Sequence, residues 1–113
     1  MSTPSKISRD GTDIARGVAA DLRQLYGDRL RAVVLFGSWA RGDATADSDV
    51  DLLVVLDEVY SRRQELRRMS DILWRHSLAH DVVVTELPVA EADYGSSHDP
   101  LLVRARLEGV RVA

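Results

Sequence analysis

The sequence predicts an α/β domain in which a small mixed β-sheet is covered by helices. Three short apolar runs, at residues 31–36, 50–56 and 82–87, have the length of buried strands. Apolar residues at helical spacing precede the first run and fill the gap between the second and third. With 113 residues, 45% of them apolar, the chain is long enough for one core. We expect a single domain at residues 11–113 behind a flexible tail at residues 1–10.

The first helix is predicted to begin at Thr12 or Asp13, either of which can cap it, and to run to Tyr26. Gly27 then ends it. Its apolar residues recur at helical spacing: Ile14, Val18, Leu22 and Leu25. A short buried strand at residues 31–36 follows.

The middle of the chain continues with one helical turn at residues 38–43 and a polar turn at residues 44–48. Residues 50–56 are almost entirely Val and Leu, which indicates a central strand covered on both faces. A helix is predicted at residues 60–78 and a third strand at residues 82–87. The helix is expected to turn one set of residues inward, Leu66, Met69, Leu73 and Leu78, and the other outward, Arg62, Arg63, Arg67 and Arg68.

The last part of the chain is less clearly patterned. Residues 88–97 favour no particular element, whereas residues 101–107 predict a final helix. Gly109 closes that helix, and residues 110–112 predict a short strand. No internal repeat or linker interrupts this order, which favours the single domain.

The strongest functional pattern lies between residues 33 and 57. Gly37 and Ser38 follow the first strand, and ten residues separate them from Asp49 and Asp51 at the start of the second. Because side chains alternate along a strand, the two carboxylates project from one face about 7 Å apart and repel each other. A divalent cation would neutralise them, and a Gly-Ser turn offers N–H groups and a hydroxyl to a phosphate. The pattern favours metal-assisted phosphoryl or nucleotidyl transfer.

Asp81 adds a third carboxylate, because it is expected to open the third strand as Asp49 and Asp51 open the second. If the three share one site, the second and third strands are parallel neighbours joined by a right-handed helical crossover. The first strand ends at Gly37 on the same edge, so it runs antiparallel to the second. This mixed topology depends on the three carboxylates converging.

The candidate residues also have plain structural interpretations. Asp81 could be a turn aspartate, and Gly37 with Ser38 could form an ordinary capped turn. Arg41 could be a surface residue. Trp39 could pack in the core or stack on a base or a partner.

Three further groups have weaker functional interpretations. His76 and His80 lie four apart on a predicted helix, a spacing compatible with a metal, but no third ligand is evident. Asp43 and Asp47 are typical turn formers. The basic run at residues 62–68 is typical of a solvated helix face, and a docking surface for an acidic partner is the alternative.

Composition excludes several classes of protein. A formal charge of −3 disfavours nucleic-acid binding by the chain alone. The absence of cysteine excludes a disulfide scaffold and thiolate metal sites, and it agrees with a cytoplasmic location. No apolar run is long enough to span a membrane, and the polar N-terminus does not resemble a secretory signal.

Taken together, Gly37-Ser38, the Asp49-x-Asp51 pair and Asp81 before VVVTEL resemble the DNA polymerase β-like nucleotidyltransferase superfamily. Within it, the chain resembles the minimal nucleotidyltransferase (MNT) group, over almost the whole domain and including the closing EGVRV. The resemblance implies the polymerase β-like nucleotidyltransferase fold. It also implies Mg²⁺-dependent attack of a hydroxyl on the α-phosphate of a nucleoside triphosphate, with release of pyrophosphate.

The resemblance further implies a role for each matching residue. Gly37 and Ser38 would hold the β- and γ-phosphates of ATP, and Arg41 would touch a phosphate. The three aspartates would be catalytic metal ligands for two Mg²⁺ ions, or Mn²⁺, and the third would also help to activate the acceptor hydroxyl: Asp49, Asp51 and Asp81.

Members of the MNT group often act with an α-helical HEPN protein as antitoxin and toxin, and can adenylylate a tyrosine of that partner. The resemblance therefore implies AMP transfer from ATP to a HEPN-type protein. The alternative is a non-catalytic antitoxin that covers its partner and retains a vestigial nucleotide site. Two strand aspartates on one face favour the active enzyme over the non-catalytic antitoxin.

Overall fold

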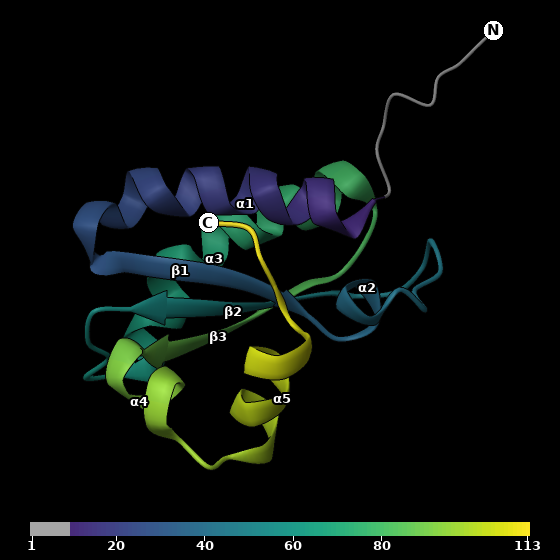
Figure 1. The fold of residues 1–113 in the computed structure, drawn as a ribbon. Helices are drawn as coiled ribbons and strands as arrows, with labels where there is room; N and C mark the ends of the chain where they lie inside the picture. Colours follow the sequence, from purple (N-terminus) through teal and green to yellow (C-terminus); the bar gives the residue numbers. More distant parts are fainter. Residues whose placement is uncertain (1–9) are drawn as a thin grey trace, which may run out of the picture.

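A four-stranded mixed sheet in the order β3-β2-β1-β4 organises the structure, a computed structural model that describes residues 10–113 (Figure 1). The strands are β1 Leu30–Phe36, β2 Val50–Leu56, β3 Val84–Ala90 and β4 Val110–Arg111. The helices are α1 Gly11–Tyr26, the 3₁₀ turn η1 Gly27–Arg29, α2 Ser38–Arg41, α3 Arg62–His80, α4 Glu91–Ser96 and α5 Pro100–Glu108. As predicted, β2 is antiparallel to β1 and parallel to β3. The predicted tail lies, apart from Asp10, outside the described residues.

Two helical layers cover the sheet, α1 and α3 on one face and α4 and α5 on the other (Figure 1). Alternation along β2 supplies both cores: Leu52 and Val54 belong to the α1–α3 cluster, and Leu53 and Val55 belong to the cluster with α5. All four side chains are buried, which confirms β2 as a central strand. The face that carries Leu53 and α5 is also the face of Asp51, which lies two residues before Leu53 on β2.

The first helix begins earlier than expected because Asp10 caps it. Its Oδ1 accepts a hydrogen bond from the N–H of Thr12 at 2.8 Å, so neither Thr12 nor Asp13 is the cap. The predicted apolar stripe is buried except at its end, where Leu25 is 45% exposed. The buried stripe continues instead through Tyr26, which is 7% exposed and lies four residues after Leu22.

Helix α3 extends two residues beyond the predicted end. The Oγ of Ser61 caps its start, accepting from Gln64 N–H at 3.2 Å. Asp81 ends it in a left-handed conformation, with φ 51° and ψ 49°. The prediction that Asp81 opens the third strand is therefore wrong, because the chain needs two more residues after this turn before β3 begins at Val84. Leu78, expected to face inward, is 65% exposed.

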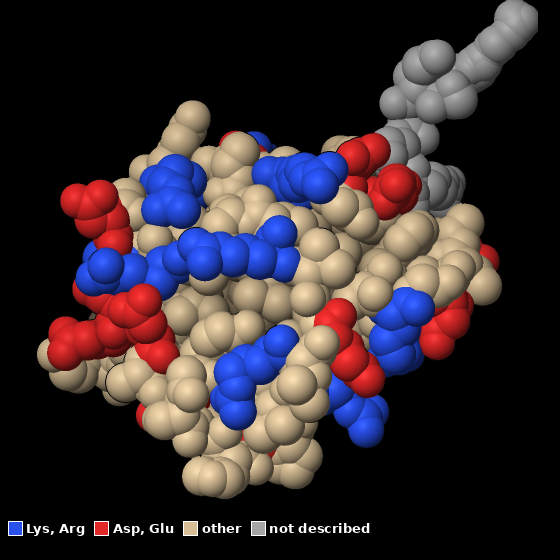
Figure 2. Space-filling view, in the orientation of Figure 1, with Lys and Arg blue, Asp and Glu red and all other residues tan. Residues whose placement is uncertain are grey.

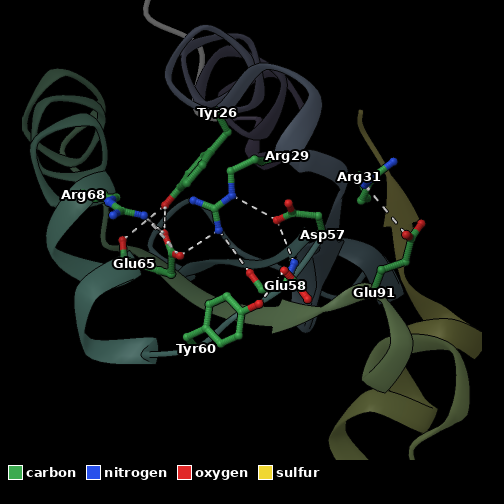
Figure 3. A network of polar contacts seen from close by, with 9 residues as sticks. All are labelled: Tyr26, Arg29, Arg31, Asp57, Glu58, Tyr60, Glu65, Arg68 and Glu91. Carbon is green, nitrogen blue, oxygen red and sulfur yellow. Dashed lines mark hydrogen bonds and ion pairs between the residues drawn. The ribbon is translucent and has the colours of Figure 1, made fainter.

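A charged network closes the end of the sheet where β2 finishes (Figure 3). Glu65 is buried and accepts hydrogen bonds from Tyr26 Oη and Arg29 Nη2, each at 2.9 Å. Arg29 also binds Asp57 Oδ1 through Nε at 3.0 Å. Burial alone would raise the pKa of Glu65, but hydrogen bonds from Arg29 and Tyr26 outweigh it and lower that pKa. Burial and the bond to Glu65 raise the pKa of Tyr26.

Acidic and basic side chains are interspersed on the face shown in Figure 2. Several of the chain's arginines are occupied by its own acceptors. For example, Arg31 lies 3.8 Å from Glu91, and Arg111 donates to the carbonyl of Arg31 at 3.2 Å. Among the described residues, no helix combines the length and the apolar character needed to cross a membrane.

Candidate functional site

The site is built around Gly37, which joins β1 to the short helix α2. Its φ of 76° lies in the region that favours glycine. A Cβ atom at this position would lie 2.5 Å from Oδ2 of Asp51. Both observations explain why the sequence has glycine here. The turn between β1 and α2 can thereby approach the Asp51 carboxylate of β2 closely.

Asp51 is held in a defined orientation. It pairs in register with Phe36 of β1 and Thr85 of β3, and Oγ1 of Thr85 donates a hydrogen bond to its Oδ1 at 2.7 Å. The other carboxylate oxygen faces Gly37. One oxygen is thus fixed by the protein and the other faces the turn where the sequence predicts a phosphate. Sequence analysis missed Thr85, because only the strand register shows that it lies beside Asp51.

Asp49 lies just before β2 and is exposed. Within residues 10–113 its carboxylate makes no hydrogen bond or ion pair. Val50, between the two aspartates, is buried in the α1–α3 core, so Asp49 and Asp51 flank a residue that points to the opposite face. The pair therefore projects from one face, as the sequence predicted, and that face is the one covered by α5.

Asp81 is not brought into a common group with this pair. The described residues contain no cluster of three or more His, Cys, Asp or Glu side chains that could hold a metal ion. Asp81 caps α3, whereas Val84 is the first β3 residue paired with β2. The expected convergence of three carboxylates is absent from this structure, and the role of Asp81 stays a prediction.

The donor set of Asp49 and Asp51 still suits one kind of metal site. Mg²⁺ commonly keeps several waters and binds through one or two carboxylates together with phosphate oxygens of a substrate. Two carboxylates beside a turn that the sequence predicts to bind phosphate would fit an ion that arrives with a nucleotide. They do not by themselves provide the ligands for a second ion.

Arg41 and Arg104 lie on a cavity of about 190 Å³ next to Gly37. Arg41 Nε lies 3.3 Å from Oδ2 of Asp43, but both side chains are exposed, so this ion pair is weak and exchangeable. Arg104 comes from α5, and its guanidinium forms no ion pair within the described residues. Glu108 also lines this cavity, so two arginines face one carboxylate there and the net positive charge favours an anionic group. Sequence analysis missed Arg104, because nothing in the sequence shows that α5 packs beside the turn.

Two alternatives raised by the sequence are decided by packing. Trp39 packs against the α1–α3 core and donates from Nε1 to the carbonyl of Ser48 at 3.2 Å, so it is a structural residue. His76 and His80 stack with ring centres 6.0 Å apart, and Nε2 of His76 lies 2.7 Å from Asp21 Oδ2. The histidine pair belongs to no metal-binding cluster among the described residues.

Comparison with known sequences identifies relatives. Residues 15–108 match the nucleotidyltransferase domain family. The chain is 32% identical over 75 residues to a candidate protein adenylyltransferase of Methanocaldococcus jannaschii, covering 66% of this chain and 75% of that protein. A second candidate protein adenylyltransferase from that organism is 37% identical over 84 residues, which is 74% of this chain but only 48% of the relative. The protein adenylyltransferase MntA of Thermococcus cleftensis is 46% identical over 41 residues, 36% of this chain and 39% of MntA.

Solved structures share the fold. A candidate minimal nucleotidyltransferase is 27% identical with a TM-score of 0.56, covering 95% of this chain and 98% of its own. A candidate nucleotidyltransferase of Sulfolobus solfataricus has a TM-score of 0.64 at 20% identity, covering 88% of this chain and 77% of its own. A toxin–antitoxin structure with AMP-PNP has a TM-score of 0.62 at 17% identity, covering 87% and 72%. The last two show a common fold alone. With its motif, its fold and the family match over residues 15–108 in agreement, this chain belongs to the nucleotidyltransferase domain family and is a nucleotidyltransferase.

Proposed function

We propose that this protein transfers AMP from Mg-ATP to a hydroxyl group of a partner protein. The observation that carries the proposal is the contact between the Gly37 turn and the oriented carboxylate of Asp51. This contact supports the proposal because a phosphate-binding turn beside a metal-binding carboxylate is the arrangement that nucleotidyl transfer requires. Relatives named as protein adenylyltransferases support AMP as the group transferred and protein as the acceptor.

Different residues of the chain would bind different parts of the donor nucleotide. Gly37 and Ser38 would hold the β- and γ-phosphates through backbone N–H groups and the Ser38 hydroxyl. Arg41 would bind a phosphate oxygen after leaving its exposed contact with Asp43. Asp49 and Asp51 would hold Mg²⁺, which neutralises charge on the triphosphate when it is bound.

The transfer itself is a displacement at the α-phosphorus. The acceptor oxygen forms a bond to the α-phosphorus, the bond to the oxygen that bridges the α- and β-phosphates breaks, and pyrophosphate leaves. The proton of the acceptor hydroxyl must pass to a base. Asp81 is the predicted base and the predicted ligand of a second ion. Among the described residues the structure does not group Asp81 with the pair, so this role rests on the family resemblance alone.

The acceptor is proposed to be a tyrosine of a HEPN-type protein, in a toxin–antitoxin pair in the cytoplasm, where ATP is available. Support comes from the MNT-like motif and from the structural likeness to a toxin–antitoxin protein. The alternative is an antitoxin that only covers its partner. The two differ in whether the partner gains the mass of AMP when both proteins are produced together.

Thermal melts with and without Mg-ATP test the nucleotide site. At 100 times its dissociation constant, Mg-ATP should add about 2.7 kcal/mol to the free energy of unfolding. Asp51→Asn should remove most of that gain, whereas Asp81→Asn should keep it and lose transfer only. A melting temperature that millimolar Mg-ATP leaves unchanged would count against the proposal.

A further inference from the structure

A long groove runs between α3 and the outer strand β3. Two adjoining cavities of about 660 and 270 Å³ form it, and both are lined by Ser70 and Glu86. Three arginines line one end: Arg62, Arg63 and Arg67. The other end is lined by Trp74, Ser77 and Val83. The groove therefore has a basic end and an apolar end.

The apolar end adjoins the candidate site. Trp74 and Leu78 lie one helical turn apart and are each 65% exposed, and Val83 is 56% exposed. The carbonyl of Val83 accepts from the N–H of Val50 at 2.9 Å, and Val50 directly follows Asp49. A protein seated at this end would thus lie at the end of the sheet where β2 begins, next to the backbone around Asp49, whose carboxylate projects toward the opposite face.

The arginines of the basic end have no partner among the described residues. Within residues 10–113 the guanidinium groups of Arg62, Arg63 and Arg67 form no hydrogen bond or ion pair. Two other arginines of the same helix do pair, Arg68 with Glu65 and Arg75 with Asp71. Of the described residues that line the groove, Glu86 is the one carboxylate, and burial raises its pKa. The groove is therefore complementary to acidic side chains.

The outer edge of β3 is closed to an added strand. Since the carbonyl of Val83 points to β2, the alternate residues Val84, Glu86 and Pro88 present their backbone outward. The N–H of Val84 donates to Ser77 Oγ at 3.1 Å, and Pro88 has no N–H. A partner must therefore bind through side chains in the groove.

We infer that this groove docks an amphipathic helix of the acceptor protein, with acidic side chains at the arginines and apolar side chains against Trp74. The inference rests on the proposed function and names the surface that recognises the acceptor. Exposed Trp and Arg are the residue types that contribute most to protein interfaces, and helices commonly bind in such grooves. Docking there holds the acceptor at the edge of the sheet, with its apolar side at the end where β2 begins.

The test uses [α-³²P]ATP, Mg²⁺ and an extract of the cells from which the gene comes. The wild type should label an acceptor protein. Arg67→Glu and Trp74→Ala should each slow that labelling at least tenfold, while the dissociation constant of Mg-ATP, measured by calorimetry, stays within twofold. Two control variants should label the acceptor like the wild type. Arg75→Glu makes the same charge change on the same helix, outside the groove. Leu107→Ala removes an exposed apolar side chain of α5.

Each other outcome overturns a defined claim. Normal labelling by Arg67→Glu and Trp74→Ala overturns the groove and leaves the proposed function intact. No labelled protein with the wild type, or label that ribonuclease removes, overturns the protein acceptor and the groove together. Weaker Mg-ATP binding by the groove variants would show that the groove binds the nucleotide and not the acceptor. If sedimentation shows that the wild type is a dimer and that Trp74→Ala abolishes the dimer, the groove binds a second copy of this chain instead.

Discussion

The two ends of the β1–β2 pair hold carboxylates in opposite ways. Where β2 finishes, Glu65 accepts from Tyr26, Arg29 and Arg68, and Asp57 pairs with Arg29 (Figure 3). Where β2 begins, Asp51 accepts one hydrogen bond, from Thr85, and Asp49 accepts none within residues 10–113. The same strand pair therefore carries a complete charge network at one end and an incomplete one at the other.

The difference separates stability from function. A buried carboxylate with three donors is satisfied within the chain, and it fixes how α1 and α3 meet. Clustered carboxylates without cationic partners cost stability unless a ligand neutralises them. The end with Asp49 and Asp51 is thus the one that depends on a ligand. Substitutions there should change AMP transfer, whereas substitutions at the end with Glu65 should change the free energy of unfolding.

The largest effect is expected at the incomplete end. Asp49→Asn and Asp51→Asn should each abolish detectable AMP transfer, because each removes a metal ligand while conserving shape. Their melting temperatures without ligand should equal or exceed that of the wild type, since repulsion is relieved. Asp47→Asn, an exposed turn residue two positions earlier, is the matched control. Substantial transfer by either variant would show that the pair does not hold the catalytic metal.

At the complete end, Glu65→Gln should lower the free energy of unfolding by about 3 kcal/mol, because it leaves Arg29 without its buried partner. The dissociation constant of Mg-ATP should not change. Urea unfolding and calorimetry check the two parts. Glu91→Gln, which removes an exposed pair with Arg31, should cost less than about 0.5 kcal/mol. If Glu65→Gln weakens Mg-ATP binding instead, the two ends are not independent.

The network should also give stability a dependence on pH. The pKa of Glu65 is lowered in the folded protein, so its contribution is complete above its unfolded pKa of about 4.3. It should be lost progressively as pH falls below that value toward the folded pKa. The difference in unfolding free energy between wild type and Glu65→Gln, measured from pH 7 to pH 3, should therefore shrink at the acid end. If the difference in unfolding free energy grew toward acid pH, the pKa of Glu65 would be raised on folding and not lowered.

A smaller effect is expected from the residue that orients Asp51. Thr85→Val removes a hydrogen bond to a charged group, worth about 1.5 kcal/mol, which corresponds to roughly tenfold weaker Mn²⁺-ATP binding. Thr85→Ser keeps the hydroxyl and should restore most of the affinity. Electron paramagnetic resonance of Mn²⁺ measures this binding without turnover. Equal affinities for the Val and Ser variants would show that the hydroxyl does not position Asp51.

The smallest effect belongs to Ser38→Ala. Backbone N–H groups of the turn still face the phosphates, so loss of one hydroxyl should weaken Mg-ATP binding only a few-fold, or about 1 kcal/mol. Calorimetric titration measures it, and Ser96→Ala on α4 is the control. A loss as large as that of Asp51→Asn would make the hydroxyl the main phosphate ligand.

Much of the fold could be predicted because its signals are local. The unbroken apolar run of β2 and the glycine turn after β1 specify a central strand and a tight approach to Asp51. The parallel β2–β3 pair was predicted correctly, but from a convergence of carboxylates that the structure does not contain. The length of the α3 crossover supports that topology independently, because parallel strands need a connection of a dozen or more residues.

Other features depend on tertiary placement and could not be predicted. Thr85 reaches Asp51 only through the register of two strands, and Arg104 reaches the turn only through the packing of α5. Leu78 satisfies the helical pattern but lies in the last turn of α3, beyond the core. Asp81 was misplaced because a left-handed helix cap and a strand start look alike in a sequence.

The central claim is that the end of the sheet at Gly37, Asp49 and Asp51 transfers AMP. The direct measurement incubates the protein and its co-purified partner with Mg²⁺ and ATP labelled on either the α- or the γ-phosphate. The account predicts partner labelled from [α-³²P]ATP only, with one pyrophosphate released per AMP added and no label with Asp51→Asn. Label from [γ-³²P]ATP would identify phosphoryl transfer instead, and an unlabelled partner that nonetheless binds would identify a non-catalytic antitoxin.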